Sequence, residues 1–147
     1  MKLYLSEITD SVKKRKVDEC MKDEVFNFGT KLKKFDITTN FYRAGEAVLL
    51  SFAGTFEFDT VCARCAEEIA VETDVSEDFH LFPEVSCDEA DYFYSGDHID
   101  LEPFLRDVFV MNIPASVCCG EMCSGICPVC GGNMNNYKCN CRDKEGV

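Results

Sequence analysis

Cysteine is the residue type in this chain whose number and spacing could do chemistry. Seven of the eleven cysteines fall within residues 118–141. Residues 127–130 read C-P-V-C, which places two thiols three positions apart, and Gly131 allows the sharp turn that lets both sulfurs bind one metal ion. A second pair with the same spacing, Cys62 and Cys65, lies far upstream. Because four thiolates complete a tetrahedral zinc site, these pairs predict metal binding.

Disulfide bonds and an iron–sulfur cluster are the alternatives to zinc. The first residues, MKLYLSEITD, lack the apolar segment of a secretory signal, and no stretch is apolar for long enough to span a membrane. We therefore expect a cytoplasmic protein with no membrane contact, in which thiols stay reduced and such spacings favour metal. The spacing of Cys123, Cys127 and Cys130 matches that of radical SAM enzymes, but no long catalytic domain follows it. Zinc is the metal that we expect.

Charge is distributed unevenly along the 147 residues, whose formal net charge is -12. Residues 1–50 carry ten basic and eight acidic side chains, whereas residues 51–147 carry five and nineteen. An acidic surface repels phosphate, so broad nucleic-acid binding by the C-terminal two-thirds is not expected. The candidate RNA-contact residues are Lys13, Lys14, Arg15 and Lys16. A solvated loop is the simpler interpretation of these four side chains, and we favour it.

Apolar residues at every second position predict the strands that must position the cysteines. The strands are expected over residues 35–41, 48–58 and 69–81, with weaker candidates at 1–5 and 25–28. Turns at residues 44–45 and 62–65 would join the three main strands, so the upstream cysteine pair would lie at the tip of a hairpin. The pattern favours an antiparallel β-meander with one face on the core, and closure into a barrel-like sheet is an alternative.

A helix is expected near residues 103–112, after an acidic linker over residues 83–98. Pro103 suits the first turn of a helix, where its missing N–H costs little, and Pro114 requires the helix to end before it. Apolar residues recur between these prolines at helical spacing and predict a stripe that faces the core.

These elements predict an α+β fold in two parts. Residues 1–113 would form a β-rich domain that includes the helix. Residues 114–147 would form a cysteine-rich zinc module docked on the 62–65 hairpin. A chain of this length and apolar content is long enough for one such domain with a small appended module.

Four motifs follow one another between about residue 45 and residue 141. They are C-x-R-C after an alternating strand, I-D-L-x-P at the start of a helix, a proline followed by C-x-x-x-C, and G-I-C-P-V-C-G-x-N-M-N leading to C-x-C. Together they resemble the YceD family, the large ribosomal RNA subunit accumulation proteins. The matching residues are Cys62, Arg64, Cys65, Ile99, Asp100, Leu101, Pro103, Pro114, Cys119, Cys123, Gly125, Cys127, Pro128, Cys130, Gly131, Asn133, Asn135, Cys139 and Cys141.

The resemblance implies a non-enzymatic role in the accumulation or processing of large-subunit ribosomal RNA and in ribosome assembly. The expected partner is a ribosome-assembly protein or a localised contact with ribosomal RNA. One departure from the family pattern is the doubled Cys118-Cys119, of which only Cys119 keeps the family's spacing to Cys123. Cys118 is therefore expected to be a spare thiol.

Eight cysteines sort into four pairs, and three assignments of ligands are open. We place first the assignment in which one site closes locally within 15 residues, because local closure costs the least chain entropy. The local site is Cys127, Cys130, Cys139 and Cys141. The other site would clamp the C-terminal module onto the sheet through Cys62, Cys65, Cys119 and Cys123. The second assignment joins the 62–65 pair to the 127–130 pair, and the third has one zinc ion per chain instead of two.

The remaining candidates carry weaker signals. Cys20 and Cys87 are isolated and are expected to be free thiols, while His80 and His98 lack the spacing of metal or acid–base partners. Arg64 could make a functional contact, although neutralising thiolate charge is the simpler role. The chain contains no recognisable nucleophile–base pair, phosphate loop or cofactor motif, so we expect neither an enzyme nor a small-molecule substrate. A cytosolic redox or metal sensor that uses its C-x-x-C pairs is the alternative function.

Overall fold

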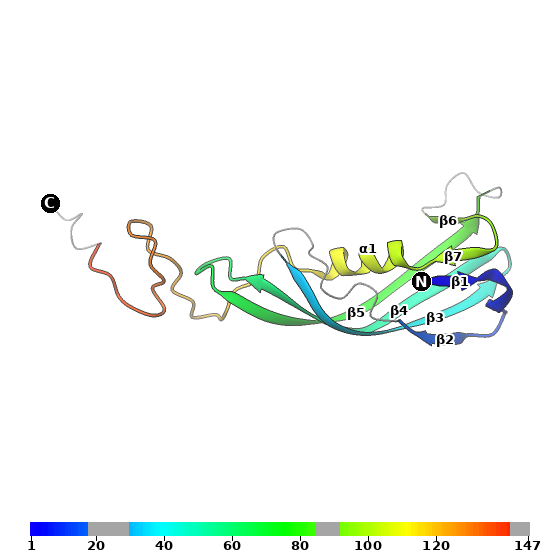
Figure 1. The fold of residues 1–147 in the computed structure, drawn as a ribbon, viewed down its shortest axis with the longest axis horizontal. Coiled ribbons are helices and arrows are strands. Elements are labelled where there is room, and N and C mark those ends of the chain that lie inside the picture. The colour runs from blue at the N-terminus through cyan, green and yellow to red at the C-terminus, as the bar shows by residue number, and fades with distance from the viewer. Residues whose placement is uncertain (18–29, 85–91, 142–147) are drawn as a thin grey trace.

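A long antiparallel sheet dominates the structure, a computed structural model that describes residues 1–17, 30–84 and 92–141. Its strand order is β2-β3-β4-β5-β6, in which β6 alone runs parallel to its neighbour (Figure 1). The strands are β2 (Lys13–Lys16), β3 (Lys31–Ala44), β4 (Ala47–Val61), β5 (Glu68–Pro83) and β6 (Tyr92–Tyr94). The three predicted strands are therefore confirmed as β3, β4 and β5, each longer than expected.

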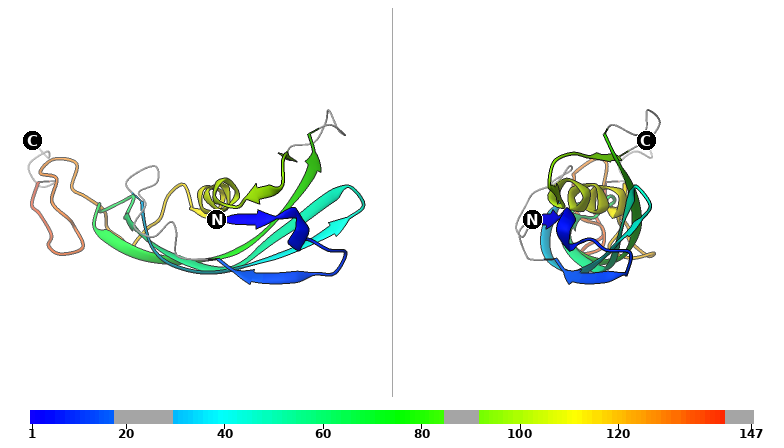
Figure 2. Two further views of the ribbon diagram at one scale, coloured as in Figure 1. Left: turned by 45° about the vertical axis from the view of Figure 1, so that its right-hand side comes forward. Right: turned by 90° about the vertical axis from the view of Figure 1, so that its right-hand side faces the viewer.

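The sheet curves into a trough, and the N-terminus and the helix lie on its concave side (Figure 2). A two-stranded sheet of β1 (Lys2–Tyr4) and β7 (His98–Asp100) and a short 3-10 helix, η1 (Leu5–Glu7), complete this layer. The helix α1 spans Glu102–Asn112 with a proline in its first turn, as predicted. In the three described segments, no helix combines the length and apolar character needed to cross a membrane.

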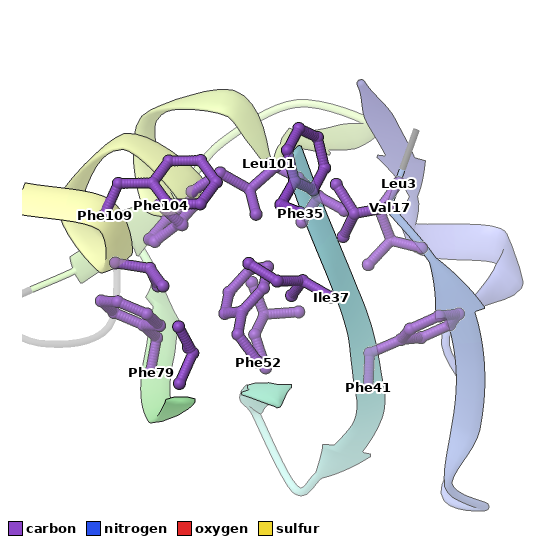
Figure 3. Packing of buried hydrophobic residues seen from close by; sticks show 14 of the residues in the cluster. Leu3, Val17, Phe35, Ile37, Phe41, Phe52, Phe79, Leu101, Phe104 and Phe109 are labelled. Atoms are coloured by element: carbon purple, nitrogen blue, oxygen red, sulfur yellow. The ribbon is translucent and has the colours of Figure 1, made fainter. Parts of the chain in front are cut away.

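Aromatic side chains fill the space between the sheet and α1 (Figure 3). The inward-facing residues of β4 alternate with exposed or half-buried ones, so Phe52, Phe56 and Phe58 are all buried. Phe109 of α1 packs on Phe56 edge to face, with ring centroids 5.1 Å apart. The predicted apolar stripe of the helix therefore faces this core, which lies well away from the cysteines.

Three expectations about the fold are wrong. The barrel-like alternative fails because β2 and β6 lie at opposite edges of the sheet and do not pair with each other in the described residues. Residues 13–16 form an edge strand paired with β3 and not a loop. The segment expected to be an acidic linker contributes β6 and the start of β7, while its residues 85–91, like the strand candidate at 25–28, lie outside the described residues.

Gly54 of β4 leaves no room for a side chain beside the β3 backbone. Its φ is +151°, and a Cβ at this position would lie 2.0 Å from the carbonyl oxygen of Asp36. We expect Gly54→Ala to lower the free energy of unfolding by about 3 kcal/mol, because both the backbone conformation and the steric contact oppose it. Gly45 has φ +64°, but a Cβ there would meet no atom within 4 Å, so Gly45→Ala should cost only about 1 kcal/mol. Denaturant midpoints would compare the two, and equal losses would contradict the steric argument.

Candidate metal centres

Four cysteine sulfurs from distant parts of the chain meet at the tip of the β4–β5 hairpin. We call this group the hairpin site: Cys62, Cys65, Cys119 and Cys123, whose Sγ atoms all lie within 4.8 Å of one another. The Cys62 and Cys123 sulfurs are 3.8 Å apart and those of Cys65 and Cys119 are 3.7 Å apart. With zinc–sulfur bonds of about 2.3 Å, a tetrahedron has sulfur–sulfur edges of about 3.8 Å. The donor set and its spacing therefore fit one tetrahedral zinc ion.

The second group lies in the C-terminal segment beyond the hairpin tip (Figure 1). We call it the tail site: Cys127, Cys130, Cys139 and Cys141, whose Sγ atoms also lie within 4.8 Å of one another. Cys127 is 1% exposed, whereas Cys130 is exposed at the surface. This site is built within one short segment, so its ligands need only local turns to meet.

The two C-x-x-C turns share one backbone geometry. In the tail site, Gly131 has φ +72° and its N–H donates to the carbonyl of Cys127 at 2.9 Å. In the hairpin site, Ala66 takes the same place with φ +59°, and its N–H donates to the carbonyl of Cys62 at 2.9 Å. The left-handed conformation is unfavourable for alanine, so the turn must be held by the contacts around it. Both turns thus have the sharp form that brings the two sulfurs of a pair together.

Hydrogen bonds also tie the C-terminal segment to the hairpin tip. The Ala63 N–H donates to the carbonyl of Val117 at 2.8 Å, and the Arg64 guanidinium donates to the carbonyl of Cys123 at 3.4 Å. Arg64 therefore contacts the backbone of a candidate ligand loop directly. Together these bonds place Cys119 and Cys123 over the 62–65 turn.

The thiols of the hairpin site differ in pKa, so some of them ionise more readily than others. Backbone N–H groups of Cys65 and Arg64 lower the pKa of Cys62 to about 6, and the Cys119 N–H also donates to its sulfur at 3.3 Å. The neighbouring sulfurs of Cys123 and Cys65 raise the pKa of Cys119 to about 12. A hydrogen bond from the Asn135 amide is the main cause that lowers the pKa of Cys123. Adjacent thiolates repel one another, and a divalent cation removes that repulsion.

The thiols of the tail site also differ in pKa. The Tyr137 hydroxyl, 3.5 Å from the sulfur, and the backbone N–H of Gly132 lower the pKa of Cys130 to about 6. A hydrogen bond with the Cys130 sulfur, and to a smaller extent the charge on that sulfur, raises the pKa of Cys141 to about 12. A site with some thiolates already formed and others held protonated is suited to a cation that displaces the remaining protons.

The structure brings together the eight cysteines in the grouping placed first from the sequence. The rival grouping is not what the structure has, because the 62–65 and 127–130 pairs lie in different sites. Cys123 is likewise separated from Cys127, so the spacing shared with radical SAM enzymes does not correspond to one cluster. Whether the eight cysteines hold metal, and which metal, stays a prediction.

The other singled-out residues lie outside both groups. Cys118 is exposed and belongs to neither, as expected of a spare thiol. His80 is exposed on β5, and His98 lies 2.7 Å from the Asp97 carboxylate. Cys20 and Cys87 lie outside the described residues.

The four candidate RNA-contact residues are largely engaged within the protein. Lys13 donates to the carbonyl of Glu7 at 2.7 Å, and Arg15 pairs with the Glu7 carboxylate at 2.8 Å. Lys16 pairs with Asp36 at 3.0 Å. Lys14 is exposed on β2 and has no ion pair within the described residues. These pairs neutralise part of the charge that an RNA contact would use.

Sequence reasoning missed the role of the polar residues around the two sites. From the sequence, Asn133 and Asn135 are among the residues that match the family, without a role for either, and neither Asn136 nor Glu67 is singled out. In the structure, Asn133 and Asn136 donate to Glu67, and Asn135 donates to the sulfur of Cys123. The signal that could have found them is the cluster of three asparagines between the two cysteine pairs of one site.

A family comparison matches most of the chain, including all eight cysteines. The model described as "Large ribosomal RNA subunit accumulation protein YceD" matches residues 50–146. This chain belongs to the YceD family. The YceD match begins within β4 and extends through both sites, while β1, β2 and β3 lie outside it.

One curated YceD relative is a protein of Arabidopsis thaliana named "Large ribosomal RNA subunit accumulation protein YCED homolog 1, chloroplastic". It is 36% identical to this chain over 47 residues, which are 32% of this chain but only 15% of the relative. No solved structure matches the chain significantly. The family and this relative are both named for accumulation of the large ribosomal RNA subunit.

Proposed function

We propose that this protein is a non-enzymatic, zinc-binding factor that supports accumulation and processing of large-subunit ribosomal RNA during ribosome assembly in the cytoplasm. The observation that carries the proposal is the family match over residues 50–146, which includes every ligand of both candidate metal sites. Both candidate sites therefore lie within the part of the chain that matches the family, and the role that we propose for the metal follows from their geometry.

The geometry favours structural zinc. Each site offers four sulfurs, so a tetrahedral ion would be saturated by protein and would have no open position for water or substrate. An ion in the hairpin site would join residues 62–65 to the segment that follows α1, and an ion in the tail site would shape that segment. Zinc would supply folding free energy, which supports a scaffold for partner binding and not a reaction.

Protein contact is the partner interaction that the charge distribution favours. The outward side chains of β5 include Glu68, Glu72, Asp74 and Asp78, and this acidic column would repel phosphate. Three of the four candidate RNA-contact residues are already engaged, so a localised RNA contact would depend mainly on Lys14. We therefore propose a ribosome-assembly protein as the first partner and local ribosomal RNA as the second.

Deleting the gene tests the role in large-subunit accumulation. We expect the amount of mature large-subunit RNA to fall relative to small-subunit RNA, because the assembly step is impaired. Wild-type protein and Cys118→Ser should restore the ratio, whereas Cys139→Ser should restore it poorly because it removes a tail-site ligand. An unchanged ratio in the deletion strain would contradict the proposed role.

The sensor alternative has one observation in its favour, which is the exposure of Cys119 and Cys130. Exposed ligand sulfurs can be reached by oxidants, although sulfur bound to zinc in a saturated site has muted reactivity. A sensor should release its metal at mild oxidant concentrations that leave the sheet folded. A structural factor should retain its metal at the same oxidant concentrations.

A further inference from the structure

A loop of the tail site reaches across to the hairpin site. Residues 133–136, which we call the asparagine loop, lie between the two cysteine pairs of the tail site. Within this loop Asn133 and Asn136 each donate a side-chain hydrogen bond to the same carboxylate oxygen of Glu67, at the hairpin tip. Glu67 in turn accepts the N–H of Cys62 on its backbone carbonyl at 2.8 Å. The loop is thus bonded to the residue that closes the turn of the hairpin site.

Asn135 makes the most direct connection. Its Nδ2 lies 3.3 Å from the sulfur of Cys123 and donates to it, although Cys123 is a ligand of the other site. Its Oδ1 accepts the N–H of Ser124 at 2.7 Å, which fixes the amide and the ligand loop relative to each other. Its own N–H donates to Oδ1 of Asn133 at 2.9 Å. One side chain from the tail site therefore orients and stabilises a thiolate of the hairpin site.

The backbone holds the asparagine loop in place as well. The Met134 N–H donates to the carbonyl of Gly125, and the Cys127 N–H donates to the carbonyl of Gly132, both at 2.9 Å. Because Cys130 and Cys139 each lie three positions from the loop, on either side of it, an ion in the tail site would close this stretch of chain into a short ring. Closing the ring orders the loop in advance. The bonds to Cys123 and Glu67 then form at a smaller cost in conformational entropy.

The two sites differ in how far apart their ligands lie along the sequence. The tail site closes within residues 127–141, whereas the hairpin site joins Cys62 to Cys123, which are 61 positions apart. We propose that the asparagine loop couples the two sites: an ion in the tail site orders the loop, and the ordered loop raises the affinity of the hairpin site for its own ion. The tail site fills first, because its ligands are close in sequence and need less chain closure than those of the hairpin site. This inference rests on the proposed metal binding and adds an order and a mechanism to it.

Thermodynamic linkage makes the coupling measurable from either site. If an ion in the tail site raises the affinity of the hairpin site by some factor, an ion in the hairpin site must raise the affinity of the tail site by the same factor. Hydrogen-bonding partners of metal ligands commonly contribute about 10–100-fold to metal affinity. We expect the factor carried by Asn135 to fall in that range.

Stepwise addition of cobalt(II) to the reduced, metal-stripped full chain tests the coupling, with thiolate-to-cobalt absorption as the readout. The wild type should bind two ions, the second in the hairpin site. Asn135→Ala should weaken that second binding by about 10–100-fold and leave the first nearly unchanged. The absorption band of the hairpin site should also move to longer wavelength, because the lost hydrogen bond no longer stabilises the sulfur electrons. Asn140→Ala is the matched control, since Asn140 is exposed and its side chain has no hydrogen bond within the described residues.

A double-mutant cycle separates coupling from a local structural effect. Cys139→Ser breaks the tail site, so it should weaken the hairpin site, and adding Asn135→Ala should then cost little more. Glu67→Gln, which keeps an acceptor oxygen, should retain more of the affinity than Glu67→Ala. Additive losses, or Asn135→Ala binding two ions as the wild type does, would overturn the coupling while leaving metal binding intact. A wild-type protein that binds no cobalt would overturn the metal sites and the coupling together.

Discussion

Protein purified without added metal is expected to contain two zinc ions per chain, and a chelator that removes them should free residues 114–141 from the hairpin tip. The effect should be large, because structural zinc sites in small peptides have apparent binding free energies of about 10–16 kcal/mol. The sheet should survive, since its aromatic core lies between the strands and α1 and contains none of the eight cysteines. Elemental analysis would give the metal content, and limited proteolysis would detect the freed segment.

The stoichiometry distinguishes the remaining alternatives. One zinc per chain would select the single-site assignment, and iron in place of zinc would contradict the structural-zinc proposal. A brown protein would indicate an iron–sulfur cluster, whereas a zinc protein is colourless. Two ions whose removal leaves proteolysis unchanged would contradict the clamp between the C-terminal segment and the sheet.

Cys62→Ser should release one ion and loosen the C-terminal segment while the tail site keeps its own ion. The expected loss is large because Cys62 is buried at 2% exposure and its sulfur accepts the N–H groups of Arg64 and Cys119. Proteolysis after Pro114 should accelerate in this variant, because the hairpin site is the clamp that holds the following segment. Metal content and cleavage rate would be measured on the same preparation.

Two further variants serve as controls for this result. Cys118→Ser should keep both ions and the wild-type cleavage rate, because Cys118 is exposed and outside both groups. Cys127→Ser should release the tail-site ion and also weaken the hairpin site through the asparagine loop. If Cys62→Ser and Cys127→Ser each released the same single ion, the division into two sites would be wrong.

Much of the fold followed from local patterns. The alternation of apolar residues predicted β3, β4 and β5 because a strand with one buried face requires that period, whatever its partners are. The prolines at 103 and 114 predicted α1 because they act on the backbone within a single turn. The short strands β2, β6 and β7 were missed, since three or four residues carry too little pattern and form strands only where a partner edge is available.

The candidate sites divide in the same way. The spacing of each C-x-x-C pair is a local property, so the pairs could be predicted from the sequence alone. How the pairs combine depends on which segments the fold brings to the hairpin tip, and spacing left three assignments open. The basic segment at residues 13–16 shows the same limit, because Arg15 pairs with Glu7 and Lys16 pairs with Asp36, which only the folded chain brings near.

The metal-binding potential and the main strands were thus predictable from residue types and short spacings, because backbone preferences and sulfur chemistry act over a few residues. The family was identified by resemblance to known proteins and confirmed by the family match. The grouping of the sulfurs and the bond from Asn135 to Cys123 required the folded chain. A hydrogen bond has direction and a reach of about 3 Å, so its partner is known only once distant segments have been placed beside each other.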